Sequence, residues 1–326
     1  MSSTLSDYEY DLPRELIAQR APERRESSRM MVLRREERSI EHRRFVELKM
    51  FLRPGDLLVL NDTRVLAAKR VSSDGAVEFL FLERVSPRRW KCLVKPGRKM
   101  RLGATAKIDN ASLRVEEILP EGERVVLLDK DVDLYAGGLM PLPPYIGRES
   151  DEGDNVRYQT VFARAPGALA APTAGLHFTQ QILRKLPHAF ITLHVGIGTF
   201  LPVRSENLAE HRMHPEHFSI SAEAANKIND AERIIAIGTT TVRVLESARS
   251  KNGRLLAQEG STDLFIYPPY RFQAVDLLLT NFHLPRSTLL MLVSAFAGRE
   301  FLLRAYREAI DERYRFYSYG DCMLIL

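Results

Sequence analysis

The stretch Ile234–Arg243 (IIAIGTTTVR) joins an apolar, β-branched run directly to a loop of glycine and threonine. Two other segments, Ile191–Phe200 (ITLHVGIGTF) and Leu277–Pro285 (LLLTNFHLP), repeat this order, and Ala171–Phe178 (APTAGLHF) supplies a further loop that contains a histidine. In open α/β sheets the loops beyond the carboxyl ends of the strands form the ligand crevice. The four segments therefore predict an α/β fold with one assembled active site.

Strands and helices are expected to alternate around these segments. Strands are predicted at Met30–Leu33, Leu57–Leu60, Phe190–Val195, Ile234–Ile237, Leu277–Leu279 and Cys322–Leu326, and helices at Phe45–Phe51, Thr179–Leu186, Ala222–Ala231, Ser287–Ala297 and Phe301–Glu312. Short β runs between turn residues predict a small antiparallel sheet or barrel in the region 67–145. We therefore expect an α/β main domain at 1–66 and 146–326, a mixed sheet with flanking helices, interrupted by an inserted small antiparallel β-barrel domain at 67–145.

Composition narrows the class of protein. The chain has 326 residues, 45% of them hydrophobic, and a formal charge of +5, which permits a nucleic-acid partner without requiring one. Cys92 and Cys322 lack CxxC spacing, which argues against a disulfide scaffold or a cysteine-built metal site and fits a reducing cytosol. No signal-peptide pattern occurs, and no apolar run approaches the roughly 20 residues that span a bilayer. A cytoplasmic protein without a membrane partner is expected.

Histidines in or near these loops are the candidate catalytic residues, because imidazole transfers protons near neutral pH. They are His177, His194, His214 and His283. A lone loop histidine is more often structural than catalytic, and the sequence does not rank the four. His211 and His214 stand among carboxylates but lack the HExxH spacing of a helical zinc site, so no metal site is predicted. A polar lid or a substrate-contacting strand is favoured there.

Loop residues near these histidines are candidates for binding a substrate. The start of a helix after Gly238 offers unpaired amide donors to an anionic or polar ligand, although the threonines there, taken alone, are more often helix caps. Neither a Walker loop nor GxGxxG is present. Phe282 could stack on a base or simply fill the core. The candidate substrate contacts are Arg64, Thr173, Gly175, Phe178, Gly196, Gly198, Thr199, His211, Thr239, Thr240, Arg243, Tyr267, Asn281 and Phe282.

A one-signed stretch lies within the predicted β module. From Arg84 to Lys107 there are nine Lys and Arg residues and no Asp or Glu. Such a stretch is a candidate phosphate-contacting face, with a solvated basic face as the alternative. The candidate nucleic-acid contacts are Arg88, Arg89, Lys91, Lys95, Arg98 and Lys99.

Longer motifs cover nearly the whole chain in order. Among them are RPGDLLVLNDTRV (53–65), PGALAAPTAGLHFT (166–179), TLHVGIGTFLPV (192–203), IAIGTTTVRVLES (235–247) and TNFHLPRSTLLMLVSAFAG (280–298). Together they resemble the S-adenosylmethionine:tRNA ribosyltransferase-isomerases of queuosine biosynthesis. Asp62, Ala76 and Phe162 depart from that pattern, where asparagine, a basic residue and tyrosine are expected.

The resemblance implies transfer of the ribosyl part of S-adenosylmethionine to 7-aminomethyl-7-deazaguanine at the tRNA wobble position. The implied products are epoxyqueuosine-tRNA, adenine and methionine. It also implies an α/β domain with an inserted β-barrel, no metal or redox cofactor, and tRNA and S-adenosylmethionine as the partners of a monomer. The four histidines would carry protons, Arg64 or Arg243 would face the methionine carboxylate or an RNA phosphate, and the basic stretch would contact tRNA.

Two other classes of function remain as alternatives. Another S-adenosylmethionine-dependent enzyme, such as an RNA methyltransferase, would normally show a glycine-rich loop after its first strand and an acidic residue after the second, and no such pair is found. A non-catalytic RNA-binding module built on the basic β region would leave the polar strand-end loops unexplained.

Overall fold

The structure, a computed structural model, describes residues 4–196, 198, 203, 205–250 and 252–326. Contacts divide the chain into two compact units. Unit 1 comprises Met1–Arg64, Pro144–Arg148 and Arg157–Leu326, and unit 2 comprises Val65–Pro143 and Glu149–Val156. Within the described ranges, no helix has the length and apolar character needed to cross a membrane.

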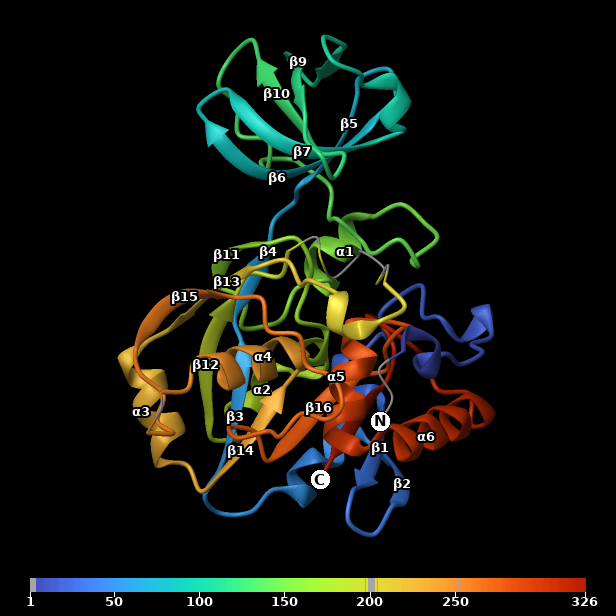
Figure 1. Cartoon of the computed structure of the whole chain (residues 1–326), viewed down its shortest axis with the longest axis vertical. Helices are drawn as coiled ribbons and strands as arrows, with labels where there is room; N and C mark the ends of the chain where they lie inside the picture. The colour runs from blue at the N-terminus through green and yellow to red at the C-terminus, as the bar shows by residue number, and fades with distance from the viewer. Residues whose placement is uncertain (1–3, 197, 199–202, 204, 251) are drawn as a thin grey trace. The chain divides into compact units, whose positions relative to one another are not determined.

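Unit 1 is built on a nine-stranded mixed sheet in the order β15-β13-β12-β3-β14-β16-β17-β1-β2. Its strands are β1 (Arg29–Arg34), β2 (Ser39–Arg44), β3 (Asp56–Asn61), β12 (His188–Leu193), β13 (Glu216–Ile220), β14 (Arg233–Ile237), β15 (Gln258–Thr262), β16 (Leu277–Asn281) and β17 (Cys322–Ile325). The central strands β12, β3, β14 and β16 are parallel neighbours, and Figure 1 shows them side by side. β3 and β16 are buried along their whole length, as continuous apolar runs require.

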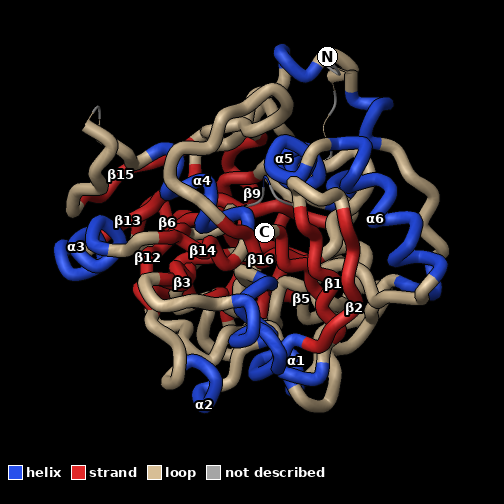
Figure 2. Tube along the Cα trace, turned by 90° about the horizontal axis from the view of Figure 1, so that it is seen from below, coloured by secondary structure: helices blue, strands red, loops and turns tan. Residues whose placement is uncertain are grey.

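Helices cover both faces of this sheet. They are α2 (Gln180–Leu183), α3 (Ala222–Asp230), α4 (Thr239–Ser247), α5 (Thr288–Ala297) and α6 (Arg299–Asp311). Figure 2 shows α4 and α5 on one side of the band of strands and α2 on the other. Alternate strand residues, such as Leu58 and Leu60, join Phe178 and Leu183 in the core on the α2 side.

Unit 2 is an antiparallel six-stranded sheet that is nearly closed. Its strands are β5 (Lys69–Val71), β6 (Glu78–Ser86), β7 (Arg89–Lys95), β8 (Thr105–Ile108), β9 (Ala111–Ile118) and β10 (Arg124–Leu128), in the order β5-β6-β7-β10-β9-β8. Beyond the end of β5, the Ser73 amide donates to the Lys107 carbonyl oxygen of β8 at 2.8 Å, so the two edges of the sheet approach each other. Trp90, Phe81 and Phe79 are buried inside. Two short strands, β4 (Thr63–Val65) and β11 (Ala165–Ala168), pair with each other, and α1 (Glu152–Arg157) lies at the chain boundary between the units.

The mixed sheet with helices and the small antiparallel sheet confirm the expected fold class in its broad form. The helix predicted at Phe45–Phe51 is a 3-10 helix. Three strands of the nine-stranded sheet were not predicted, β2, β13 and β15, and neither was the short pair of β4 and β11. β2 and β15 are half-buried or exposed along nearly their whole length, so their sequences, SIEHRR and QEGST, lack the apolar alternation that marks a strand.

Candidate active site

Polar residues stand at the carboxyl ends of the four parallel strands and therefore share one edge of the sheet. His194 follows β12, Asp62 and Thr63 follow β3, residues 238–240 follow β14, and Asn281 ends β16. The parallel direction of the strands makes this convergence a consequence of topology, as in other open α/β sheets. This edge is the candidate active site.

The segment 165–177 crosses that edge from β12 toward β16. Near β12, the Leu169 amide donates to the Val195 carbonyl oxygen at 2.8 Å. At its far end, the 3-10 helix Thr173–His177 packs against β16. The PTAGLH loop therefore lies over strand ends instead of following a strand of its own.

Asn61 fixes the spacing of the strand ends. Its side-chain oxygen accepts from the Leu193 amide at 3.0 Å and the Thr63 amide at 3.1 Å. Its side-chain nitrogen donates to the Leu193 carbonyl oxygen at 2.9 Å and lies 3.5 Å from the Thr240 hydroxyl. The ends of β3 and β12 and the start of α4 are thereby tied together.

His177 is buried at this edge and bonded on both sides of its ring. Its Nδ1 lies 2.9 Å from Ser28 Oγ, and its Nε2 lies 3.3 Å from Asn281 Oδ1. Because the Asn281 nitrogen donates to the Tyr317 carbonyl oxygen, Asn281 Oδ1 is the acceptor, so Nε2 of His177 carries the proton and Nδ1 accepts from Ser28. Burial lowers the His177 pKa to about 4 and keeps the imidazole neutral, although the Asn281 hydrogen bond acts in the opposite direction.

His194 is half-buried and has one ring nitrogen available. Its Nδ1 lies 2.8 Å from Thr63 Oγ1, while its Nε2 forms no hydrogen bond with any described residue. A Cβ added to Gly167, where φ is 153°, would lie 2.7 Å from Nδ1, so the ring needs a glycine at that position. Burial lowers the His194 pKa, and nearby His217 lowers it further.

Asp62 forms a small polar network beside His194. Its Oδ1 accepts from the Thr192 hydroxyl at 2.6 Å, and its Oδ2 accepts from Arg164 Nε at 2.5 Å. The Arg164 guanidinium also lies 5.0 Å from the centre of the Phe190 ring. A carboxylate in place of the expected asparagine therefore supplies an ion pair at this edge.

Arg243 is buried within unit 1 and is already bonded there. Its guanidinium donates to the Glu216 carboxylate, to the Leu264 carbonyl oxygen at 3.1 Å and to the Thr262 carbonyl oxygen at 3.2 Å. The other Glu216 oxygen accepts from the Gly196 amide at 2.8 Å. This buried pair holds the loop after β12 against α4, which replaces the ligand contact expected of Arg243 from the sequence.

His283 lies on the opposite face of the sheet from His177. Its Nε2 lies 2.8 Å from Thr280 Oγ1, and its amide donates to the Tyr306 hydroxyl at 2.9 Å. Successive strand residues point to opposite faces, so Thr280 with His283 and Asn281 with His177 lie on different sides. Burial lowers the His283 pKa to about 3. This core position departs from the expectation that both histidines contact one substrate.

Three other candidates are packed in the core. Phe178 is fully buried and meets the Phe45 ring edge-on at 4.9 Å, and Phe282 is fully buried among aromatic rings of α6 and the following segment. A Cβ on Gly175 would lie 2.8 Å from the Phe162 ring. Packing accounts for all three without a ligand.

The remaining candidates differ in how far they are exposed. Phe265 lies between His211 and Tyr267, with ring centres 5.0 and 4.8 Å away. A Cβ on Gly198 would lie 3.2 Å from the His214 ring, so this loop packs against that histidine. Arg64 is exposed, Thr173, Gly196 and Thr240 are half-buried, Thr239 is buried, and Thr199 lies outside the described residues.

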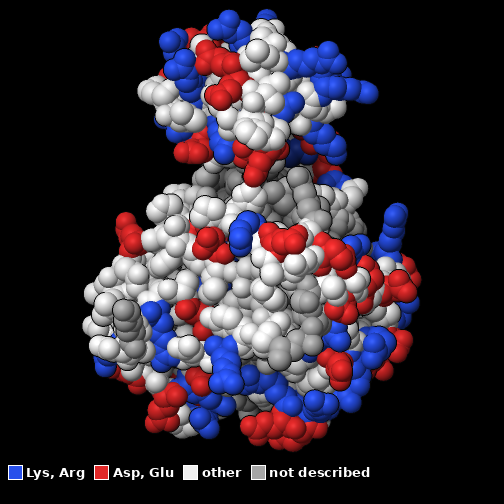
Figure 3. Space-filling model, in the orientation of Figure 1, with Lys and Arg blue, Asp and Glu red and all other residues white. Residues whose placement is uncertain are grey.

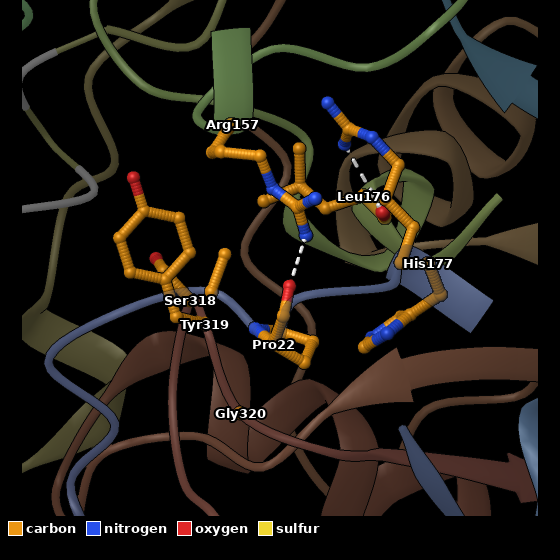
Figure 4. Close-up of a pocket in the computed structure, with 9 residues that line it drawn as sticks. Pro22, Arg157, Leu176, His177, Ser318, Tyr319 and Gly320 are labelled. Atoms are coloured by element: carbon orange, nitrogen blue, oxygen red, sulfur yellow. Dashed lines mark hydrogen bonds between the residues drawn. The ribbon is translucent and has the colours of Figure 1, made fainter. Parts of the chain in front are cut away.

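A small pocket opens beside His177, and Figure 4 shows Arg157, His177 and Tyr319 around it. Its volume is about 10 Å³, room for about one water molecule. Arg25 also lines it. No group of three or more His, Cys, Asp or Glu side chains that could hold a metal ion occurs in the part of the chain that the structure describes.

Acidic residues neutralise part of the basic stretch in unit 2. The ion pairs are Arg84–Asp131 at 2.6 Å, Arg89–Glu116 at 2.8 Å and Lys91–Glu123 at 3.0 Å. The other candidates are exposed and form no ion pair with any described residue. They are Arg88, Lys95, Arg98 and Lys99. Figure 3 shows acidic side chains between basic ones on the visible face of unit 2. The partner acids come from later strands and turns, so they could not be recognised from the run of basic residues alone.

Sequence patterns did not single out Ser28, Asn61 or Arg157. Ser28 and Asn61 stand in the SSRM and VLNDTR stretches, and Arg157 opens RYQTVFA. RPGDLLVLNDTRV, which contains Asn61, is one motif of the resemblance described above, and the stretches around Ser28 and Arg157 resemble the same family. That resemblance was the available signal. Their importance comes from partners that are distant in the chain, as in the contact of Ser28 with His177.

Comparison with known proteins gives the same family as the sequence motifs, along nearly the whole chain. The model of a family described as "Queuosine biosynthesis protein" matches residues 5–325. The S-adenosylmethionine:tRNA ribosyltransferase-isomerase of Acetivibrio thermocellus is 48% identical over 98% of this chain and 99% of its own length, and that of Symbiobacterium thermophilum is 49% identical over 99% of both. A crystal structure of S-adenosylmethionine tRNA ribosyltransferase from Thermotoga maritima is 40% identical, with a TM-score of 0.56 over 98% of this chain and 100% of that one.

Proposed function

This chain belongs to the queuosine biosynthesis family of S-adenosylmethionine:tRNA ribosyltransferase-isomerases, and we propose that it transfers the ribosyl group of S-adenosylmethionine to 7-aminomethyl-7-deazaguanine at the tRNA wobble position. Epoxyqueuosine-tRNA, adenine and methionine are the products of this proposal. The observation that carries it is the single sheet edge at which His177 and His194 lie near the ends of parallel strands. The proposed steps are proton transfers and displacements, for which no metal or redox cofactor is invoked.

His177 is the base in this proposal, with Ser28 as its relay. The sulfonium acidifies the hydrogens on the 5′ carbon of the ribosyl group, and a neutral group must take one of them. The low pKa of His177 keeps it neutral at physiological pH. The Ser28 hydroxyl takes the carbon-bound proton while giving its own to Nδ1, and Asn281 holds the ring in position.

His194 is the acid in this proposal and acts at the adenine end of S-adenosylmethionine. Adenine leaves more easily when one of its nitrogens receives a proton. The protonated form of His194, which its lowered pKa makes the stronger acid, would give that proton from the unbonded Nε2. Three strand spacings separate β12 from β16, about 14 Å in all, which is of the order of an extended S-adenosylmethionine molecule. Thr239 and Thr240 begin α4, beyond the intervening strand β14, where they would bind ribose hydroxyls.

Unit 2 is, in this proposal, an insertion in the α/β domain that contributes contacts to tRNA. Its exposed cations Arg88, Lys95, Arg98 and Lys99, which form no ion pair with the residues that the structure describes, are available to phosphates, whereas Arg89 and Lys91 are held by glutamates. The modified base would leave its stack to reach the reacting groups, as chemistry on a base requires. We propose a monomer that acts in the cytoplasm.

One assay tests the function. The purified protein is incubated with S-adenosylmethionine and tRNA that contains the precursor base, and the released small molecules are identified. Adenine is expected. S-adenosylhomocysteine would indicate a methyltransferase, and release of neither would indicate a binding module; either result contradicts the proposal.

Matched variants test the catalytic residues. His177→Gln should slow adenine release by about 100-fold or more, the usual contribution of a general base. Ser28→Ala should slow it in the same direction while tRNA affinity stays unchanged. His42→Gln, which alters an exposed imidazole on the edge strand β2, is the control and should retain activity. Full turnover by His177→Gln would remove that residue from the mechanism.

A further inference from the structure

The pocket beside His177 contains positive charge that the proposed proton transfers do not use. Arg25 and Arg157 both line it, together with Tyr319. Arg157 donates to the Pro22 carbonyl oxygen at 2.5 Å, the bond marked in Figure 4, and to that of Glu23 at 3.0 Å. Both of these partners are neutral main-chain oxygens, the weaker kind of acceptor for a guanidinium.

Arg157 retains an unused donor. Its Nε is buried and has no hydrogen-bond partner, and its guanidinium forms no ion pair with the residues that the structure describes. The charge of Arg157 does act on the nearby Glu26, but Arg24 already holds that carboxylate through two hydrogen bonds, at 2.7 and 3.0 Å. A buried N–H without an acceptor destabilises a folded protein, so its presence in a pocket indicates a missing partner.

Other cations reinforce the positive charge around the pocket. Burial, and after it the nearby charge of Arg157, lower the Arg25 pKa to about 10. Arg25 and Arg315 both disfavour a proton on His177. A sulfonium ion brought to this place would be repelled unless it came with an anionic group.

We propose that Arg157, assisted by Arg25, binds the carboxylate of the methionine part of S-adenosylmethionine. This inference rests on the proposed function. A carboxylate has the oxygens that a guanidinium binds best, and it would replace the neutral main-chain acceptors of Arg157 as the pocket widens. Only a short alkyl chain joins that carboxylate to the sulfonium, so the 5′ carbon would come close to Ser28 and His177.

The two arginines suggested by the sequence for this role are placed differently. Arg243 is bonded to Glu216 within the core, and Arg64 is exposed. Arg157 is half-buried, faces a pocket and adjoins the proposed base. Geometry therefore favours it over both.

The test compares S-adenosylmethionine with decarboxylated S-adenosylmethionine as donors. The unaltered protein should have a KM at least about tenfold lower for the donor with a carboxylate, the value of one charge-assisted hydrogen bond. Arg157→Gln should raise the KM for S-adenosylmethionine by about the same factor and leave the KM for the decarboxylated donor within about twofold, with kcat little changed. Arg157→Lys should restore part of the discrimination, because it keeps the charge.

Three outcomes would overturn this inference. The unaltered protein could treat both donors alike, a result that needs no variant. Arg157→Gln could raise both KM values equally, which would indicate a structural role. Arg157→Gln could instead raise the KM for tRNA and reduce the salt dependence of tRNA binding by the amount that corresponds to about one phosphate contact. That result would mean that the pocket binds a tRNA phosphate. Absence of adenine release from either donor would be a separate result, against the proposed function itself.

Discussion

Acidification should destabilise unit 1 through two buried, neutral histidines. The pKa is lowered to about 4 for His177 and to about 3 for His283, both by burial. In the unfolded chain each would titrate near 6.5. Because the folded pKa values are the lower ones, their stabilising effect is complete above about pH 6.5 and is lost as the pH falls. Between pH 7.5 and pH 5 the loss is about 2 kcal/mol for each histidine, about 4 kcal/mol together.

Urea unfolding at about pH 7.5 and about pH 5 measures this difference. Far-UV circular dichroism reports unit 1 together with unit 2, while Trp90, the single tryptophan of the chain, reports unit 2 alone by fluorescence. His283→Gln should reduce the pH-dependent loss by about 2 kcal/mol, whatever its effect on stability at neutral pH. His217→Gln, with its side chain already in water, is the control.

The reasoning would be refuted by a pH-dependent loss in His283→Gln as large as in the unaltered protein. That result would mean that the ring at position 283 is charged or hydrated in the folded state. A shift of similar size in the Trp90 transition would also contradict it, because neither histidine belongs to unit 2.

Two further predictions concern charge. The triple variant K95A, R98A and K99A should weaken tRNA binding and reduce its salt dependence by up to about three contacts, whereas Arg89→Ala, which removes a cation already paired with Glu116, should change the salt dependence little. Equal effects of the two changes in binding titrations at several salt concentrations would contradict this. Asp62→Asn should lower the free energy of unfolding by less than about 1 kcal/mol, because its arginine partner is mostly exposed, and a loss above about 2 kcal/mol in urea titrations would show a stronger network.

The sequence predicted where the candidate site lies better than it predicted which residues face that site. An apolar run followed by Gly-Thr-Thr-Thr identifies a strand end, and parallel strand ends meet by topology, so the edge could be located without coordinates. Whether a residue faces that edge depends on alternation along the strand. Thr280 and Asn281 are neighbours in the chain, yet one bonds the core histidine His283 and the other bonds His177.

Ion pairs between residues that are distant in the chain could not be predicted from the sequence. Arg243 and Glu216 are 27 positions apart, and only the fold shows that they form a buried pair. The acids that neutralise Arg89 and Lys91 likewise come from other strands and turns of unit 2. A pattern of charges along the chain describes a surface only when neighbouring strands add no charge of their own.

The different surroundings of the two site histidines suggest which is base and which is acid. His177 is fully enclosed, bonded at both nitrogens and surrounded by cations, so it can accept a proton only through Ser28 and holds that proton at a cost. The low pKa keeps the ring neutral, and therefore able to accept a proton, at physiological pH. His194 is half-buried with Nε2 unbonded, so solvent can recharge it after it protonates adenine. Burial lowers the pKa of both histidines, so it is their different access to solvent that divides the two roles.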